Sequence, residues 1–172
     1  KHVLLFDEQN MYALALASPS IAKRTPIGAY IAYLDYRVTP DSVQLLALDE
    51  EARAHTLSIS TSLSVSRSDA FTCSTVNKAL FFNDGYLLST YTSSVIVFAT
   101  SDDSANQRRE IYHAKSAVID MCLNEDKTML AILSEEHVEI ISISDATLSC
   151  LVVRSLPFAY QRISMRDSLL IL

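Results

Sequence analysis

Met129-Leu-Ala-Ile-Leu-Ser-Glu-Glu-His-Val-Glu-Ile-Ile-Ser142 contains two short apolar runs on either side of an acidic break. The run before the break is wholly apolar, and the run after it is rich in isoleucine and valine. Runs of this length between polar breaks are typical of β-strands that are buried on both faces. The stretch therefore predicts two antiparallel strands joined by a turn at Ser134 to Glu136.

The second of these runs recurs along the chain. Related segments begin at His2, His55 and Ser94, and each carries an apolar anchor residue near its end. The four anchors are Phe6, Ile59, Phe98 and Ile141, which lie 53, 39 and 43 residues apart. Such spacing is typical of repeat proteins in which each unit is one four-stranded sheet. We expect each anchor to lie on the third strand of its unit and to pack between units.

The strands around the anchors divide the chain into units. Complete four-stranded units are expected over about 29–67, 73–113 and 117–155, with half units at 1–18 and 159–172. Residues 18–28 are expected to form a loop between units. The apolar residues keep no helical spacing over a window of helical length, so the prediction is an all-β fold of four-stranded antiparallel sheets.

The composition is that of a globular protein with an acidic balance. The chain has 172 residues, of which 49% are hydrophobic, and its net charge is −6. Two basic pairs, Lys23-Arg24 and Arg108-Arg109, are candidate contacts for protein partners. Direct nucleic-acid binding is disfavoured, because it needs a concentrated basic patch. The apolar runs are shorter than the roughly 20 residues that cross a bilayer, and the first residues do not have the basic-then-apolar pattern of a leader, so we expect no membrane span and no signal peptide.

The three cysteines indicate an intracellular setting. Cys73, Cys122 and Cys150 are odd in number, and their spacing fits neither a disulfide framework nor a zinc site. We therefore expect reduced and mostly buried thiols. The expected location is the cytoplasm or the nucleus.

The sequence lacks the common motifs of catalysis. It contains no glycine-rich phosphate loop, no His-Glu-x-x-His and no Gly-x-Ser-x-Gly. His2, His55 and His137 are expected at the entry of third strands in different units, too far apart to share one metal ion. Asp35 and Asp120 lie in apolar first strands without a partner nucleophile. We predict a protein that is not an enzyme, with no metal ion and no cofactor.

The units resemble degenerate WD-repeat blades of β-propellers. The clearest match is Tyr112-His-Ala-Lys-Ser-Ala-Val118, followed by a turn at Asn124 to Lys127. Phe6-Asp7 falls on the Trp-Asp position of the family. The chain departs from the family pattern because it has no tryptophan and only two glycines.

The resemblance implies a β-propeller of four-stranded blades, of which this chain holds a part. A closed propeller has about four to eight blades. The chain supplies about four, so we expect the propeller to be completed by sequence outside it or by another chain. The resemblance also implies structural roles for Asp7 and His113, the latter in the hydrogen-bond network of such blades.

Two classes of function fit such a propeller. The first is a non-catalytic protein-protein interaction scaffold, a subunit of a larger eukaryotic assembly of the membrane-trafficking coat or tether, nuclear pore or ribosome-assembly type. The second is a regulatory propeller that acts on another enzyme such as a small GTPase, or a propeller enzyme. The lack of a catalytic motif favours the scaffold, with other protein subunits as its partners. A β-sandwich adhesion domain is a further alternative, but it leaves the repeat spacing unexplained.

Overall fold

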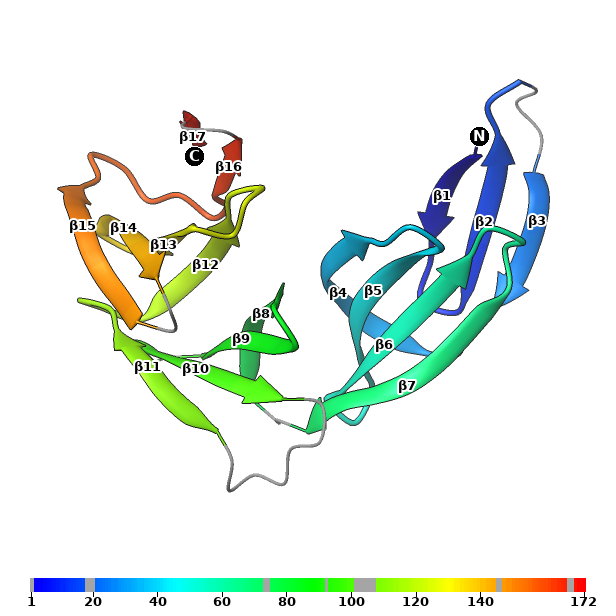
Figure 1. Cartoon of the computed structure of the whole chain (residues 1–172), viewed down its shortest axis with the longest axis horizontal. Helices are drawn as coiled ribbons and strands as arrows, with labels where there is room; N and C mark the ends of the chain where they lie inside the picture. Colours follow the sequence, from blue (N-terminus) through cyan, green and yellow to red (C-terminus); the bar gives the residue numbers. More distant parts are fainter. Residues whose placement is uncertain are drawn as a thin grey trace. The chain divides into compact units, whose positions relative to one another are not determined.

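The chain folds into β-sheets throughout the described residues (Figure 1). The computed structural model describes residues 2–17, 21–72, 75–91, 93–100, 108–144, 147–166 and 169–172. These residues divide into two compact units, 1–74 and 75–172. The prediction of an all-β fold with four-stranded antiparallel sheets is confirmed.

Unit 1 contains a three-stranded sheet followed by a four-stranded sheet. The first sheet has the order β1 (His2–Phe6), β2 (Asn10–Ala15) and β3 (Ile21–Pro26). The second has the order β4 (Tyr30–Val38), β5 (Ser42–Asp49), β6 (Arg53–Ser60) and β7 (Val65–Thr72). All neighbouring strands are antiparallel. Met11, Tyr30, Leu57 and Ile59 belong to the apolar core of this unit.

The loop predicted over 18–28 is wrong for its central part. Residues 21–26 form β3, which pairs with β2 from Leu14↔Ile21 to Asn10↔Pro26. The segment lacks an apolar pattern because β3 is an edge strand, where lysine and proline are tolerated. Two strands, β2 and β3, follow β1 in its sheet, whereas only one strand follows each of the strands that carry the other anchors, β6, β10 (Val95–Thr100) and β14 (His137–Ser144). Phe6 is thus not on the third strand, a position that belongs to β2.

Unit 2 contains two four-stranded sheets and a final hairpin. The first sheet has the order β8 (Val76–Phe82), β9 (Gly85–Thr90), β10 (Val95–Thr100) and β11 (Arg109–His113). The second has the order β12 (Val118–Leu123), β13 (Met129–Ser134), β14 (His137–Ser144) and β15 (Thr147–Ser155). The hairpin pairs β16 (Ser164–Arg166) with β17 (Leu169–Ile171).

The wholly apolar run 130–133 lies on β13, a strand whose two faces are both buried. Its residues 130–133 are all fully buried. Leu130 and Ile132 pack in the cluster shared with sheet β8–β11, while Ala131 and Leu133 pack in a second cluster with Ile163 of the C-terminal segment. Alternate side chains point to opposite faces of a strand. The sheet is therefore covered on both faces, as a blade between two neighbours must be.

Polar side chains connect the two four-stranded sheets of unit 2 at their inner and outer strands. The amide nitrogen of Asn77 on β8 donates to the carbonyl oxygens of Val118 (2.7 Å) and Ile119 (3.0 Å). At the outer side, the Tyr112 hydroxyl donates to Oε2 of buried Glu139 at 2.7 Å. Burial and this hydrogen bond both raise the pKa of Tyr112. Hydrogen bonds at both ends of the interface fix how one sheet lies on the other.

Candidate protein-interaction site

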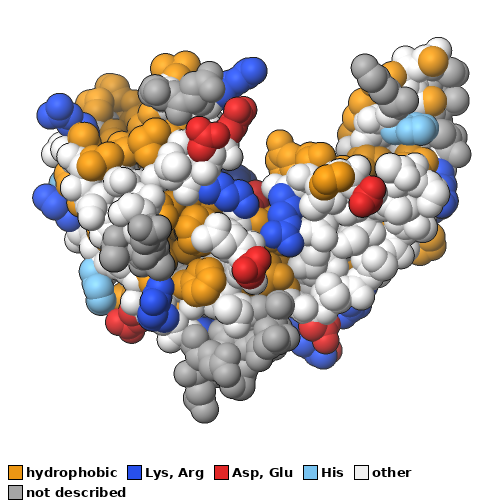
Figure 2. Space-filling model, in the orientation of Figure 1, with side chains coloured by type: hydrophobic (Ala, Val, Ile, Leu, Met, Phe, Trp, Pro, Cys, Tyr) orange, Lys and Arg blue, Asp and Glu red, His pale blue; other side chains and the backbone are white. Residues whose placement is uncertain are grey.

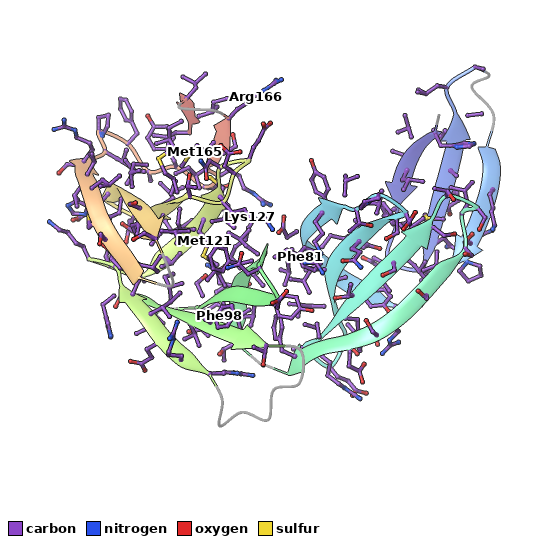
Figure 3. All side chains as sticks on the ribbon, viewed as in Figure 1. Phe81, Phe98, Met121, Lys127, Met165 and Arg166 are labelled. Atoms are coloured by element: carbon purple, nitrogen blue, oxygen red, sulfur yellow. The ribbon has the colours of Figure 1, made fainter. Side chains whose placement is uncertain are left out.

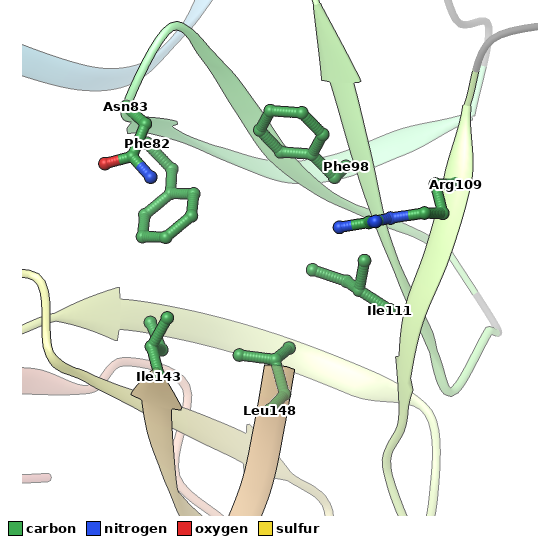
Figure 4. Close-up of a pocket in the computed structure, with 7 residues that line it drawn as sticks. All are labelled: Phe82, Asn83, Phe98, Arg109, Ile111, Ile143 and Leu148. Carbon is green, nitrogen blue, oxygen red and sulfur yellow. The ribbon is translucent and has the colours of Figure 1, made fainter. Parts of the chain in front are cut away.

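An apolar pocket opens between the two four-stranded sheets of unit 2 (Figure 4). Its volume is about 70 Å³. Side chains from both sheets line it: Phe82, Asn83, Phe98, Arg109, Ile111, Ile143 and Leu148. Phe98 also packs against the core shared by the sheets, to which Met121 of β12 belongs (Figure 3). The pocket is thus an open continuation of the apolar interface between two blades.

The topology places this pocket at one rim of unit 2. Phe82 and Asn83 lie at the β8–β9 turn, and Phe98 lies near the end of β10. Ile143 and Leu148 flank the connection from β14 to β15. In a sheet of consecutive antiparallel strands, these connections share one edge. We call this edge the turn rim, because the β8–β9 turn is its best-defined connection.

Arg109 gives the pocket its charge. Its side chain extends over the apolar residues, between Phe98 and Ile111 (Figure 4). Arg109 is exposed and makes no ion pair within the described part of the chain. Its neighbour Glu110 lies instead 3.6 Å from His113 Nε2. An unpaired guanidinium beside a small apolar pocket is suited to a carboxylate next to an aliphatic side chain.

The size of the pocket limits what it can hold. A cavity of about 150 Å³ is known to bind benzene, and this pocket has about half that volume. It therefore suits a branched aliphatic side chain better than an aromatic ring. The aliphatic group and the carboxylate together describe a short segment of a protein.

The other predicted partner-binding residues lie elsewhere. Arg108 directly precedes β11 and is half-buried. Lys23 and Arg24 lie on β3 in unit 1, where both make internal contacts. Lys23 Nζ donates to the Leu63 carbonyl at 2.8 Å, and Arg24 Nε donates to Asn10 Oδ1 at 3.1 Å. Their role in partner binding stays a prediction.

The predicted structural residues differ in their surroundings. Ile59 and Ile141 are 3% and 0% exposed and lie in the cores of their units. Phe6 packs against the unit 1 core from β1. Asp7 is exposed and closes the β1–β2 turn by accepting hydrogen bonds from the backbone of Gln9 and Asn10.

The environment of Asp7 is nevertheless strongly polar. The Tyr12 hydroxyl donates to Oδ2 at 2.7 Å. This bond, followed by the Gln9 amide, lowers the pKa of Asp7 to about 2. Asp7 is therefore a turn residue held by its own hairpin, and not the end of a third strand as its Trp-Asp position implied.

The WD-repeat resemblance implies that His113 belongs to a hydrogen-bond network within its blade, and this role is wrong. The His113 side chain is 68% exposed, and its partner is Glu110 on the same strand. The hydroxyl of Ser134, at the end of β13, donates to the His137 carbonyl and not to His113. The two four-stranded sheets of unit 2 are joined instead by apolar packing, by the Asn77 and Tyr112 hydrogen bonds and by an ion pair between Lys78 and Asp120.

Of the two carboxylates in first strands, Asp120 is held in a buried ion pair. Lys78 Nζ lies 3.0 Å from Asp120 Oδ1, and the Ile163 amide donates to Oδ2 at 3.0 Å. The sequence gives no signal for Lys78, which meets Asp120 only because β8 and β12 are neighbouring inner strands. This arrangement joins three segments of unit 2. Asp35, the other carboxylate, lies on β4 in unit 1.

The cysteines differ from the expectation of mostly buried thiols. Cys122 is half-buried, and burial and then Asp120 raise the pKa of its thiol to about 11. Cys150 is exposed, because it lies on β15, the outermost strand of its sheet. Cys73 lies outside the described residues.

A charged cluster around His55 in unit 1 has no counterpart in the sequence predictions. The buried imidazole lies between Asp49 Oδ2 (2.8 Å from Nε2) and Asp69 Oδ1 (3.0 Å from Nδ1), and the Arg67 guanidinium lies across its ring. Burial raises the pKa of Asp49, but hydrogen bonds from His55 and the Arg53 amide outweigh it, so the net shift is downward. The two carboxylates lie on opposite sides of the ring and do not converge on one metal ion. The described residues contain no cluster with the donors of a metal site.

Comparison with known proteins shows the fold. No family model matches the chain, and no curated protein matches it either. Among solved structures, BBS1N in complex with ARL6DN is similar with a TM-score of 0.61 and 10% identity, over 91% of this chain and 50% of that one. Hsv2p from Kluyveromyces lactis has a TM-score of 0.60 and 12% identity, over 96% and 51%.

A third similar structure is a WD40 domain. The WD40 domain of SCAP from fission yeast matches with a TM-score of 0.51 and 13% identity, over 91% of this chain and 43% of that one. The sheets are therefore blades of the β-propeller type. The chain spans about half the length of these solved structures. The described residues include no helix long and apolar enough to cross a membrane.

Proposed function

We propose that this chain is part of a non-catalytic protein-interaction scaffold. The observation that carries the proposal is the turn-rim pocket, where an unpaired Arg109 lies beside an apolar opening between two blades. Apolar anchors within a polar rim are typical of protein interfaces. The sheet β12–β15, which forms one side of the pocket, is packed on both faces, so this side of the site is presented by a rigid support.

The proposed setting is a larger intracellular assembly. The scaffold would be a propeller subunit in the cytoplasm or nucleus, of the trafficking coat or tether, nuclear pore or ribosome-assembly type, with other protein subunits as partners. BBS1N supports this in general terms, since it was solved in complex with a second protein. Further blades, from the same protein or another chain, would complete the propeller, because the chain covers about half of its structural neighbours.

Quantitative co-purification tests the proposal. The tagged full chain is compared with Arg109→Glu, and with Arg154→Glu as a matched control, since Arg154 is exposed on β15 and does not line the pocket. We expect wild type and Arg154→Glu to recover the same protein subunit, and Arg109→Glu to recover at least about fivefold less, because reversing a charge at an interface opposes binding. Equal recovery by all three, or no stable partner at all, contradicts the proposal.

The identity of the recovered protein also decides between the two remaining functions. A partner without enzymatic activity supports a structural subunit. A partner that is an enzyme, whose rate changes when the wild-type chain is added but not when Arg109→Glu is added, supports the regulatory propeller. The complex of BBS1N with ARL6DN is the observation that keeps this alternative open.

A further inference from the structure

A second cavity in unit 2 lies away from the turn-rim pocket. Its volume is about 350 Å³, within the range of small-ligand sites. Its wall includes Asn77, Tyr91, Ser116, Val118, Ile119 and Glu135. None of these residues lines the turn-rim pocket, so the two openings are separate sites.

The topology places the second cavity at the opposite rim. Tyr91 follows β9, Ser116 lies in the connection from β11 to β12, and Glu135 lies in the β13–β14 turn. In consecutive antiparallel strands, these connections lie at the edge away from the β8–β9 turn. We call this edge the crossover rim, because the chain passes from one sheet to the next there.

Three polar side chains at this cavity, those of Glu135, Ser116 and Asn77, can each accept a hydrogen bond. Within the described residues, the Glu135 carboxylate has no hydrogen bond or ion pair, and it is exposed at the turn. Ser116 Oγ is shielded from solvent and has no hydrogen-bond partner in the described structure. Both amide hydrogens of Asn77 are directed to the Val118 and Ile119 carbonyls, which leaves its Oδ1 as an acceptor.

From this acceptor set we infer that the crossover-rim cavity binds a basic side chain, a lysine ammonium or an arginine guanidinium, from a peptide segment of a partner. Glu135 supplies the opposite charge, and the exposed ring of Tyr91 supplies an aromatic surface for the cation. Ser116 reaches the ligand by rotation about its single χ angle, because no hydrogen bond holds its oxygen. A donor that enters the cavity also relieves the cost of that unpaired oxygen.

The same groups argue against other ligands. A phosphate or carboxylate would meet the Glu135 charge without a compensating cation on the cavity wall. A metal ion would need several ionisable ligands, and the described residues hold no such cluster here. The net charge of −6 further favours a basic partner through long-range attraction.

Titration of the 15N-labelled full chain tests the inference by NMR. The probes are N-acetyl-lysine methylamide and N-acetyl-arginine methylamide, with N-acetyl-glutamate methylamide as the probe of opposite charge. We expect the two cationic probes to shift the amide signals of 116–119 and Glu135 in a saturable manner, and the anionic probe to leave them unchanged. Equal shifts with all three probes, or no saturable shift with the cationic ones, overturn the inference.

Two neighbouring glutamates provide a matched pair of variants. Glu135→Gln removes the charge from the cavity wall, whereas Glu136→Gln removes a neighbouring exposed charge that does not line the cavity. We expect Glu135→Gln to weaken binding of the lysine probe by up to about fivefold, the upper end of the range for an exposed charge pair, and Glu136→Gln to leave it unchanged. Equal weakening by both variants shows a general charge effect and contradicts the assignment.

Ser116→Ala separates binding from stability. The hydroxyl makes no hydrogen bond in the described structure, so its removal is expected to leave the urea midpoint unchanged or slightly higher. The affinity for the lysine probe should fall about threefold, since one acceptor is lost. A lower urea midpoint with unchanged affinity assigns Ser116 to structure and removes it from the site. The result is independent of Arg109→Glu, so this inference can fail while the proposed scaffold stands.

Discussion

At the scale of single residues, Gly85 is where a side chain has no room. It begins β9 directly after the Asn83-Asp84 turn, and its backbone pairs with Thr100 of β10. A Cβ on Gly85 would overlap the Ala99 carbonyl oxygen and would lie 2.8 Å from Phe98 Cζ. The carbonyl belongs to the strand ladder and cannot move freely. The absence of a side chain thus lets the Phe98 ring lie beside β9, where it forms one wall of the turn-rim pocket.

We predict that Gly85→Ala lowers the free energy of unfolding by about 2 kcal/mol, the usual cost of overpacking a closed site. The matched control is Asp84→Ala, an exposed turn position one residue away. Urea denaturation followed by circular dichroism measures both variants. Asp84→Ala should unfold within about 0.5 kcal/mol of wild type. A Gly85→Ala midpoint equal to that of wild type would mean that β9 and β10 adjust without strain.

At the scale of strands and sheets, the sequence pattern predicts the buried strands correctly but predicts the exposed outer strands less accurately. The sheets β8–β11 and β12–β15 could be predicted because their second strands, β9 and β13, are mostly apolar and buried on both faces, and because the turns before these strands carry Asn and Asp. The errors fall on outer strands. The sequence pattern indicates a loop where β3 forms, and β7 extends to Thr72, beyond the unit end that the pattern predicts at 67. An outer strand makes ladder hydrogen bonds on one side only, and its side chains bury less surface than those of a central strand. Polar residues are therefore tolerated there, and the apolar pattern that predicts a strand is weak.

The residues of the two candidate sites can be predicted from the sequence to different degrees. Arg109 could be named because it belongs to a basic pair, but its apolar neighbours come from two sheets that meet only after packing. Ser116 and Glu135 lie in connections with no regular spacing. The role of Lys78 could not be predicted from the sequence either, because its ion pair with Asp120 is evident only when β8 and β12 lie side by side.

The Lys78–Asp120 pair connects β8, β12 and the segment before β16, and its loss should weaken all three connections. Asp120 is 4% exposed and accepts hydrogen bonds from the amides of Met121 and Ile163. We predict that Asp120→Ala lowers the free energy of unfolding by about 3 kcal/mol, because it leaves a poorly solvated ammonium and two unpaired amides. Urea denaturation provides the measurement.

The paired variant Lys78→Met should cost less than Asp120→Ala, since Asp120 keeps its two amide donors. Lys115→Met is the control, as Lys115 is exposed and its side chain makes no ion pair in the described structure. In hydrogen exchange, Asp120→Ala should also speed exchange of the Ile163 amide selectively. Unchanged protection of that amide would show that the pair does not hold the C-terminal segment.

At the scale of the whole molecule, the sheets at the two ends of the chain leave apolar side chains uncovered. Val3 and Leu5 on β1 are 41% and 49% exposed, while Leu4 between them packs against the unit 1 core. On β17, Leu169 and Ile171 are 64% and 51% exposed. Figure 2 shows hydrophobic side chains at the surface of both units. A propeller blade packs on both faces, so these faces have the character of surfaces that a neighbouring blade covers.

We predict that the 172-residue chain on its own associates in a concentration-dependent way, because uncovered apolar strand faces and edges pair with one another. Val3→Lys with Leu5→Lys should shift the population toward monomer and leave the melting temperature nearly unchanged, since both side chains already face solvent. Leu4→Lys, which places a charge in the unit 1 core, should unfold that unit instead. Sedimentation velocity over a wide concentration range measures the association. A well-folded wild-type monomer at every concentration would show that the exposed faces need no cover, and would contradict the proposal that further blades complete this propeller.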